Sequence, residues 1–243
     1  MAKKILVLSG KGGVGKSTVT VCLAQAFAEM GKRVLCMDAD VGFRSLDLIM
    51  RIGAEAVYNW ADVISGNVAL DEATVKKTEG LYLLCAPNSL SDGVNGEGIE
   101  ELLKKADESF DYIFIDAPAG FGELHEALAK VSGLVLLVAT PDAVCVRSAD
   151  TAISKALRVN PKAETRMIIN RFKKSEVLAG RQLKLDDVID MTRTQLAGVI
   201  PENDSVRLIP GGAPIAPTAQ KAFDRTARRL GGEYILFSKR YFS

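Results

Sequence analysis

The chain begins with a short apolar run that leads directly into a glycine-rich loop, and this feature restricts its fold more than any other. The apolar run is Ile5–Leu8, and residues 10–17 have the sequence Gly-Lys-Gly-Gly-Val-Gly-Lys-Ser. A strand, a loop with this spacing and a following helix form a P-loop, whose backbone amides surround phosphate oxygens. We therefore predict a phosphate site between a first strand and a helix over Lys16–Met30.

The residue types in this loop indicate separate roles. Glycines allow the backbone to curl so that successive N–H groups face one point. The lysine at 16 is expected to reach the β- and γ-phosphates, and the hydroxyl at 17 to ligate Mg²⁺. The alternative, a glycine-rich turn without a ligand, does not explain why strand, spacing and Lys-Ser pair coincide. The predicted nucleotide-binding set is Gly10, Lys11, Gly12, Gly13, Val14, Gly15, Lys16, Ser17 and Thr18.

The rest of the chain alternates short β-branched runs with helical patterns, which is typical of an α/β fold with a mostly parallel twisted sheet and helices on both faces. Further strands are predicted at Arg33–Met37, Leu81–Cys85, Tyr112–Ile115, Gly133–Val138, Arg166–Ile169 and Ala197–Ile200. Further helices are predicted at Gly98–Glu108, Glu123–Lys130, Ala143–Arg158, Leu185–Gln195 and Thr218–Leu230, with a surface loop over Pro210–Pro217.

Length and composition favour one globular domain. A chain of 243 residues, 48% hydrophobic and 25% charged, fits one α/β domain over residues 1–232 with a short tail at 233–243. The net charge of +1 argues against a broad nucleic-acid footprint. Four cysteines without CxxC spacing indicate core residues in a reducing cytoplasm. We expect neither a signal peptide nor a membrane-spanning helix.

Carboxylates follow two of the predicted strands at their carboxyl ends, where open α/β sheets bind ligands. Asp38 and Asp40 follow the second strand, and Asp116 ends the strand in Asp111-Tyr-Ile-Phe-Ile-Asp116. An aspartate that ends such a strand can hold Mg²⁺, as in a Walker B motif. Asp111 lies at the opposite edge and is expected to be structural. For Asp38 and Asp40, capping of the next turn is the alternative.

The whole string Gly-Lys-Gly-Gly-Val-Gly-Lys-Ser-Thr resembles the deviant Walker A signature of the MinD/ParA family of P-loop ATPases. The resemblance implies ATP and Mg²⁺ as cofactors, and it implies that Lys11 acts in trans on the phosphates of a partner in an ATP-dependent homodimer. An exposed, solvated lysine is the alternative for that residue. The catalytic set implied by the family is Lys11, Lys16 and Asp40.

The same resemblance implies roles for the loops around the phosphate site. Residues 38–42 correspond to switch I, in which Asp40 would position the attacking water and Asp38 would support the Mg²⁺ shell. Residues 117–120 correspond to switch II, which can sense the γ-phosphate. Two later loops resemble the family's base-contacting loops, although a role as turn residues stays open. The implied adenine contacts are Asn170, Arg171, Pro201 and Glu202, and the implied metal ligands are Ser17, Asp38 and Asp116.

Stretches outside the P-loop resemble the MinD members in particular, among them Asp40–Met50 and Gly198–Glu202. Ser45 departs from the asparagine common there. This likeness implies an ATPase that recruits a MinC-like division inhibitor and is stimulated by a MinE-like or other factor. It also implies a cytoplasmic protein that binds reversibly to the inner face of the cell membrane. The alternatives are a ParA-like DNA-partitioning module and a flagellar-placement ATPase. An iron-protein reductase is disfavoured because residues 119–124 lack cysteine.

The C-terminal tail is less typical of the family. The tail is short and aromatic, and on a helix its rings over Tyr234–Phe242 would form one apolar arc with cations outside it. Such a tail can bind an anionic membrane surface weakly, or it can pack on the domain instead. The lone histidine, His125, is expected to be a surface or boundary residue, because a single imidazole makes a poor metal site.

Overall fold

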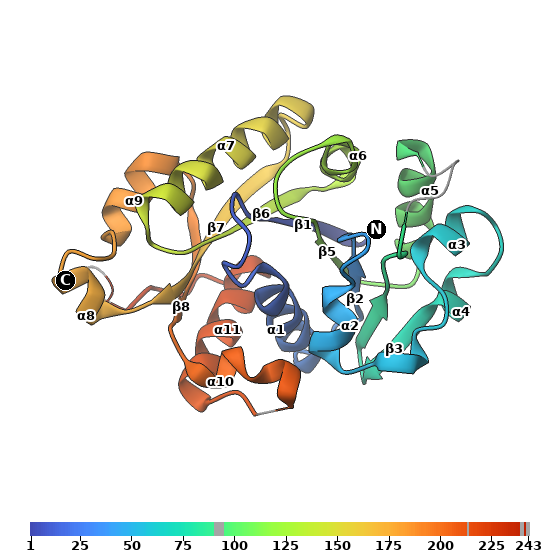
Figure 1. The fold of residues 1–243 in the computed structure, drawn as a ribbon, viewed down its shortest axis with the longest axis horizontal. Helices are drawn as coiled ribbons and strands as arrows, with labels where there is room; N and C mark the ends of the chain where they lie inside the picture. Colours follow the sequence, from blue (N-terminus) through green and yellow to red (C-terminus); the bar gives the residue numbers. More distant parts are fainter. Residues whose placement is uncertain (90–94, 213, 239–240, 242–243) are drawn as a thin grey trace.

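An eight-stranded sheet forms the centre of the molecule (Figure 1), for which a computed structural model describes residues 1–89, 95–212, 214–238 and 241. The strand order is β3-β4-β2-β5-β1-β6-β7-β8, and every pairing is parallel except that of β3 with β4. The strands are β1 (Lys3–Leu8), β2 (Val34–Asp38), β3 (Thr74–Thr78), β4 (Leu81–Leu84), β5 (Tyr112–Asp116), β6 (Leu134–Ala139), β7 (Glu164–Phe172) and β8 (Leu196–Pro201).

The seven predicted strands and the parallel fold class are confirmed, and the sequence analysis missed only β3 among the described strands. β3 has the sequence Thr-Val-Lys-Lys-Thr and is half-buried to exposed, so it lacks the apolar run that marks the others. It lies at the edge of the sheet, where lysines suit a strand with one unpaired side. The parallel strands are buried on both faces, as their continuous apolar runs predict.

Helices cover both faces of the sheet (Figure 1). α1 (Lys16–Glu29) and α11 (Pro217–Leu230) pack together on one face, while α5 (Gly96–Ala106), α6 (Glu123–Val131) and α7 (Ala143–Val159) follow one another across the other, with α9 (Leu185–Thr192) beside α7. The shorter helices are α2 (Ser45–Met50), α3 (Trp60–Ile64), α4 (Leu70–Ala73), α8 (Lys174–Leu178) and α10 (Asp204–Arg207), with single 3₁₀ turns η1 (Gly53–Glu55) and η2 (Ile209–Gly211).

All six predicted helices are present, although α5 lies two residues earlier than the predicted Gly98–Glu108, and two other predictions need correction. The helix predicted over Leu185–Gln195 ends at Thr192, because Arg193 adopts a left-handed conformation with φ 49°. The loop predicted over Pro210–Pro217 contains part of η2 and the first residue of α11, while position 213 lies outside the described residues. Proline at the first position of α11 fits, since that position needs no N–H donor.

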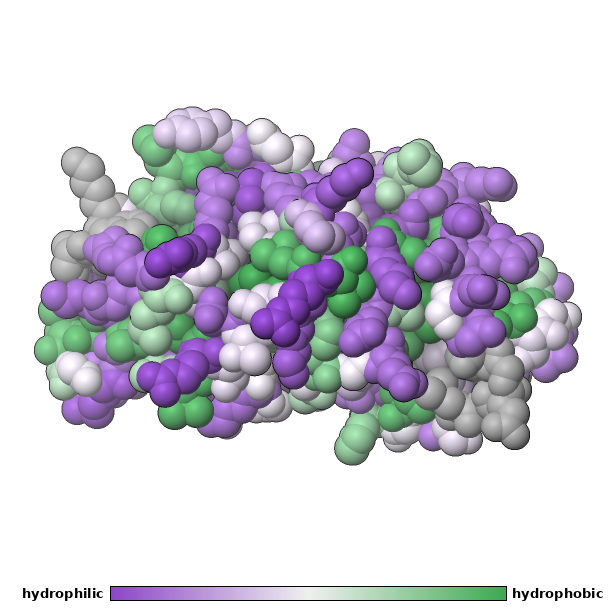
Figure 2. Space-filling model, turned by 90° about the horizontal axis from the view of Figure 1, so that it is seen from above, coloured by the Kyte–Doolittle hydropathy of each residue, from purple (hydrophilic) through white to green (hydrophobic). Residues whose placement is uncertain are grey.

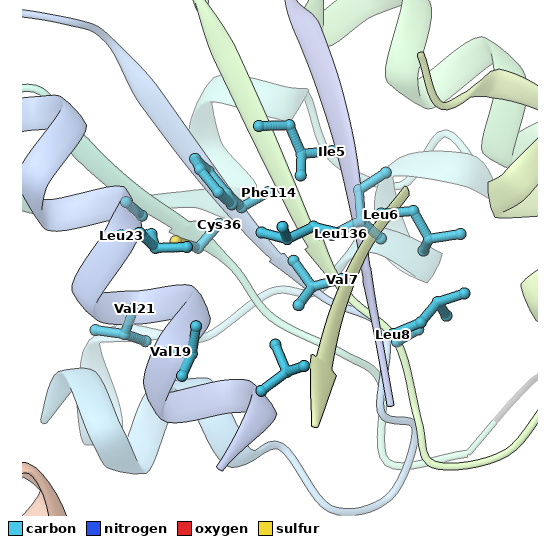
Figure 3. Close-up of a cluster of buried hydrophobic side chains, with 14 of the residues drawn as sticks. Ile5, Leu6, Val7, Leu8, Val19, Val21, Leu23, Cys36, Phe114 and Leu136 are labelled. Atoms are coloured by element: carbon cyan, nitrogen blue, oxygen red, sulfur yellow. The ribbon is translucent and has the colours of Figure 1, made fainter. Parts of the chain in front are cut away.

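The core lies between the sheet and α1 on one side and between the sheet and α6–α7 on the other. Figure 3 shows the alternation along β1: Val7 points toward α1, where Val19 and Leu23 lie, whereas Leu6 and Leu8 point away from it. All four cysteines are buried free thiols, as predicted for core residues. The packing on both faces fixes where each strand ends within the sheet. The residues predicted to bind phosphate and metal lie at or just after the carboxyl ends of β1, β2 and β5.

In the part of the chain that the structure describes, neither the surface nor the tail contains a long apolar helix. Seen from above in Figure 2, hydrophilic side chains predominate and apolar ones show between them. Among the described residues, no helix is long and apolar enough to cross a membrane. Glu233–Ser238 forms no helix, so the apolar arc expected for a helical tail is not formed over these residues. Lys239, Arg240 and Phe242, also part of that expectation, lie outside the described residues.

Candidate nucleotide-binding site

The P-loop takes the conformation that its glycines allow. Gly13 and Gly15 have φ of 78° and 90°, in the region that side chains disfavour. Gly10 is required for a different reason, because a Cβ there would lie 2.2 Å from the backbone carbon of Ser148 in α7. A Cβ at Gly12, in contrast, would meet no atom within 4 Å. The P-loop therefore packs against α7 at Gly10 and is open at Gly12.

The P-loop lysine, Lys16, and the aspartate that ends β5, Asp116, contact each other inside the protein. Lys16 Nζ lies 2.8 Å from Asp116 Oδ1 and within 3.5 Å of the Ser17 hydroxyl. The Thr20 hydroxyl also lies 3.0 Å from Asp116 Oδ1. Asp116 is fully buried, and its second oxygen, Oδ2, has no hydrogen-bond partner among the described residues. An unpartnered buried carboxylate oxygen close to a hydroxyl suits a hard divalent cation and its water.

Switch I is held by Asp38. Its Oδ1 accepts from the Asp40 N–H and its Oδ2 from the Leu46 N–H, both at 2.9 Å, while the Trp60 indole N–H donates to the Asp38 carbonyl at 2.8 Å. Burial raises the pKa of the Asp38 carboxyl to about 6, against the opposing effect of the two amides. The carboxylate thus organises the turn into α2, and its role in the Mg²⁺ shell stays a prediction.

A cavity of about 350 Å³ joins the P-loop to both switches. Asp40 from switch I and Ala119 from switch II line it together with the P-loop backbone, Lys16 and Ser17. Burial raises the pKa of Asp40, and the Lys16 ammonium acts in the opposite direction. Asp40 thus lies on the cavity wall, and its role in positioning water stays a prediction. The remaining lining residues are Ser9, Thr18, Ser45, Ile49 and Arg171.

Lys11 lies outside this arrangement. Its side chain is exposed and makes no hydrogen bond or ion pair within the parts of the chain that the structure describes. The two lysines of one loop therefore differ completely in surroundings: Lys16 is 7% exposed and paired, whereas Lys11 faces outward. No hydrogen bond or ion pair to another described residue accounts for Lys11.

The four residues predicted to contact the base line one small pocket beside the P-loop. Asn170 and Arg171 lie in the last three residues of β7, and Pro201 ends β8 with Glu202 directly after it, so neighbouring parallel strands bring them together with Gly15 and Thr18. Asn170 is 5% exposed, and its Nδ2 donates to the Val14 carbonyl at 2.8 Å. One of its amide hydrogens is thus committed to the P-loop. Three further lining residues were not anticipated: Asn203, Val206 and Arg207.

Two residues that contact the site escaped the sequence analysis. Thr20 lies one helical turn after Lys16, and that i, i+4 spacing could have placed its hydroxyl beside the same carboxylate. His125 was expected at the surface or boundary but is 4% exposed, and it contacts the backbone of switch II. The position of His125 in the first turn of α6, after a glycine-rich segment, could have indicated a contact with the preceding loop. Asp111 accepts the Arg33 N–H at 2.8 Å, a structural contact.

A strand–loop–helix phosphate cradle, a buried aspartate at the end of β5 and two loops facing one cavity define a P-loop nucleoside triphosphatase. A family model described as ParA, an NUBPL iron-transfer P-loop NTPase, matches residues 1–169. The septum site-determining protein MinD of Synechocystis is 33% identical over 98% of this chain and 92% of its own length. The chain belongs to the MinD/ParA family.

Solved structures agree with this assignment. The MinC:MinD cell division protein complex of Aquifex aeolicus contains a chain that is 34% identical, with a TM-score of 0.88 and 98% coverage of both chains. MinD of Pyrococcus horikoshii, solved with Mg-ADP, is 25% identical with a TM-score of 0.81, covering 95% of this chain and 96% of its own. Members of the family are ATPases, and the protein is accordingly an ATP- and Mg²⁺-dependent ATPase of the MinD kind.

Proposed function

We propose that the protein is a MinD-like switch that dimerises when ATP binds, recruits a MinC-like division inhibitor to the membrane and is released by hydrolysis. The observation that carries the proposal is the contrast between the two P-loop lysines. Lys16 is paired inside the chain, while Lys11 faces outward beside the open Gly12. A lysine on that side of the loop can reach the phosphates of a second copy. Dimerisation would then report that the γ-phosphate is present.

Within one chain, hydrolysis uses the groups around the cavity. Bound Mg²⁺ would supply charge neutralisation for the phosphates, and Ser17 and Asp116 would hold it. Lys16 would stabilise charge on the β- and γ-phosphates, and Asp40 would orient the water. Lys11 of a second copy would add a cation on the open side of the loop. Phosphoryl transfer needs little covalent chemistry from the protein, so positioning carries the rate.

The dimerisation step can be tested by size-exclusion chromatography with light scattering in ATP and Mg²⁺. Asp40→Ala should accumulate as a dimer, because nucleotide binds and the water is no longer oriented. Adding Lys11→Ala to it should return the protein to a monomer that still binds nucleotide. Lys32→Ala, which changes an exposed lysine between α1 and β2, is the matched control and should leave the dimer intact. A dimer that persists without Lys11 would refute the proposal.

Membrane recruitment rests on the described part of the tail. Tyr234 and Leu236 are 91% and 71% exposed, whereas Phe237 and Tyr241 pack against the core. Two exposed apolar side chains per chain, doubled in a dimer, would give weak but additive membrane binding. We expect more co-sedimentation with anionic liposomes in ATP than in ADP. The double variant Tyr234→Ser, Leu236→Ser should lose this difference, and Leu178→Ser, which changes a side chain that is 73% exposed on α8, should keep it. Equal pelleting in ATP and ADP would refute recruitment.

The ParA-like alternative is supported by a cluster of cations on α11. Lys221, Arg225 and Arg229 line a hollow of about 380 Å³. Arg229, however, donates to the carbonyl groups of Ile235 and Leu236 in the tail, and Arg228 pairs with Glu233. These contacts occupy part of the basic surface, which favours the MinD-like function. A gel shift with non-specific duplex DNA and ATP that weakens steeply with salt would favour partitioning instead.

A further inference from the structure

The segment of residues 117–122, which contains switch II, has almost no backbone support of its own. It connects β5 with α6, and Ala119 within it lines the phosphate cavity. Ala117 donates to the Val7 carbonyl, but Ala119, Gly120 and Phe121 form no backbone–backbone hydrogen bond with another described residue. Gly120 also has φ of 96°. A segment of this kind needs a side chain to hold it in one conformation.

His125 provides that support from the first turn of α6. Its ring spans the segment: Nδ1 lies 3.0 Å from the Gly122 N–H and Nε2 lies 3.0 Å from the Pro118 carbonyl oxygen. An amide can only donate and a carbonyl can only accept, so both bonds require the neutral ring with its proton on Nε2. Gly122 caps α6 and has no side chain, which leaves His125 as the residue that reaches back to the cap.

The His125 ring is also held by an aromatic side chain that stacks on its face. Phe121 stacks on it with centroids 5.3 Å apart and planes 25° from parallel, and the Lys155 ammonium of α7 lies 5.9 Å from the Phe121 ring. His125 is 4% exposed, so it has little freedom to leave these contacts. Two hydrogen bonds and one stacked ring therefore hold the loop on both sides of Ala119 and Gly120.

We propose that His125 is a positioning residue for ATP hydrolysis, which sets the backbone of residues 118–122 so that Ala119 faces the γ-phosphate. It touches no reacting atom and acts through Pro118 and Gly122. The proposal rests on the proposed function for the hydrolysis step alone. A loop held in advance presents its amide to the phosphate without first being ordered, which lowers the barrier to hydrolysis. Binding of ADP does not involve that contact.

Three substitutions separate the two bonds of the ring. His125→Ala removes both. His125→Asn places an oxygen near the position of Nδ1 and keeps the acceptor for Gly122, while His125→Gln places an N–H near Nε2 and keeps the donor for Pro118. Glu126→Ala changes the next residue, which is exposed, and is the matched control. Thermal melts establish that each variant is folded.

The measurements are kcat and KM for Mg-ATP and the Kd for Mg-ADP. We expect His125→Ala to lower kcat roughly 10-fold, with KM and the ADP Kd within about twofold of wild type. The Asn and Gln variants should each recover part of kcat, and Glu126→Ala should match wild type. Equal kcat in all three His125 variants, or a parallel loss of ADP affinity, would overturn the proposal. A wild-type protein without ATP turnover would instead contradict the assignment as an ATPase.

Discussion

The two switch segments face the same cavity but are held in different ways. Switch I follows β2 and is fixed by a buried carboxylate, Asp38, which accepts two backbone amides while Trp60 binds its carbonyl. Switch II follows β5 and is fixed by a helix side chain, His125, across a nearly unbonded loop. Asp38 lies at the end of the strand that precedes switch I, whereas His125 lies in the helix that follows switch II. Removing the first should damage the fold, and removing the second should damage the rate.

The largest effect expected from this contrast is on Asp38. Asp38→Ala leaves the amides of Asp40 and Leu46 without their acceptor, and the Leu46 bond is buried. We expect a loss of about 3 kcal/mol in the free energy of unfolding. Urea denaturation measures it, with Asp111→Ala as the control, because Asp111 accepts one exposed amide at the other end of the sheet. Equal losses in both variants would contradict the central role of Asp38.

A smaller effect is expected at Trp60, which is fully buried. Trp60→Phe removes the N–H donor to the Asp38 carbonyl and some packing volume, so the free energy of unfolding should fall by about 2 kcal/mol. Combining it with Asp38→Ala should cost less than the sum, because both changes loosen the same turn. Strict additivity in a urea double-mutant cycle would show that the two contacts support separate elements.

On the switch II side, Phe121 offers a milder change. Phe121→Leu keeps an apolar side chain but removes the stack on His125 and the contact with the Lys155 ammonium. We expect a loss of about 0.5–1 kcal/mol in the free energy of unfolding. Lys155→Gln should lose only the cation contact and cost less. A larger loss for Lys155→Gln than for Phe121→Leu would contradict this account of the stack.

The smallest expected effect is a dependence of stability on pH. Burial lowers the pKa of His125, the Pro118 carbonyl and the charge of Asp40 oppose this, and the charge of Lys16 adds to it. Just below the ordinary histidine pKa of about 6.5, the unfolded chain therefore binds a proton that the folded protein does not. The contribution of His125 to stability is present above that pKa and declines as the pH falls toward its folded value.

Urea denaturation at about pH 7.5 and about pH 5.5 checks this dependence. The stability of wild type relative to His125→Asn should shrink at the lower pH. Asp38, whose pKa is raised to about 6 by burial, titrates in the same window, but it does so in both proteins and cancels in the difference. A relative stability that is unchanged, or that grows on acidification, would show that His125 is not held in its neutral form.

The sequence predicted where the motif-bearing residues of the site lie in the fold. A P-loop and two strand-end aspartates carry local signals, and a parallel sheet brings strand ends to one edge whatever their separation in the chain. The same rule placed Asn170, Arg171, Pro201 and Glu202 in one pocket. The roles assigned to these residues stay predictions.

The contacts that the sequence could not give depend on three-dimensional packing. His125 is buried because the stacked Phe121 ring and the switch II backbone enclose it. The hydrophobic periodicity of α6 does not predict this burial. The left-handed Arg193 ended a helix that its apolar pattern would have continued. The tail was similar: a helical arc could be drawn from its sequence, but the Arg229 guanidinium holds the carbonyls of Ile235 and Leu236 in a non-helical segment.

One feature of the central sheet limits which insertions this protein can tolerate. In the parallel register, Asp116 stands opposite both Val7 and Asp38. Side chains alternate between the two faces of a strand, so adding or deleting a single residue within β5 would turn the carboxylate of Asp116 to the face opposite Lys16. Adding two residues would return the carboxylate of Asp116 to the original face of the sheet but would move it along the strand. Natural variation in length is therefore expected in the surface loops, while the short segment between Tyr112 and Asp116 should keep the same residue count in every working version of the enzyme.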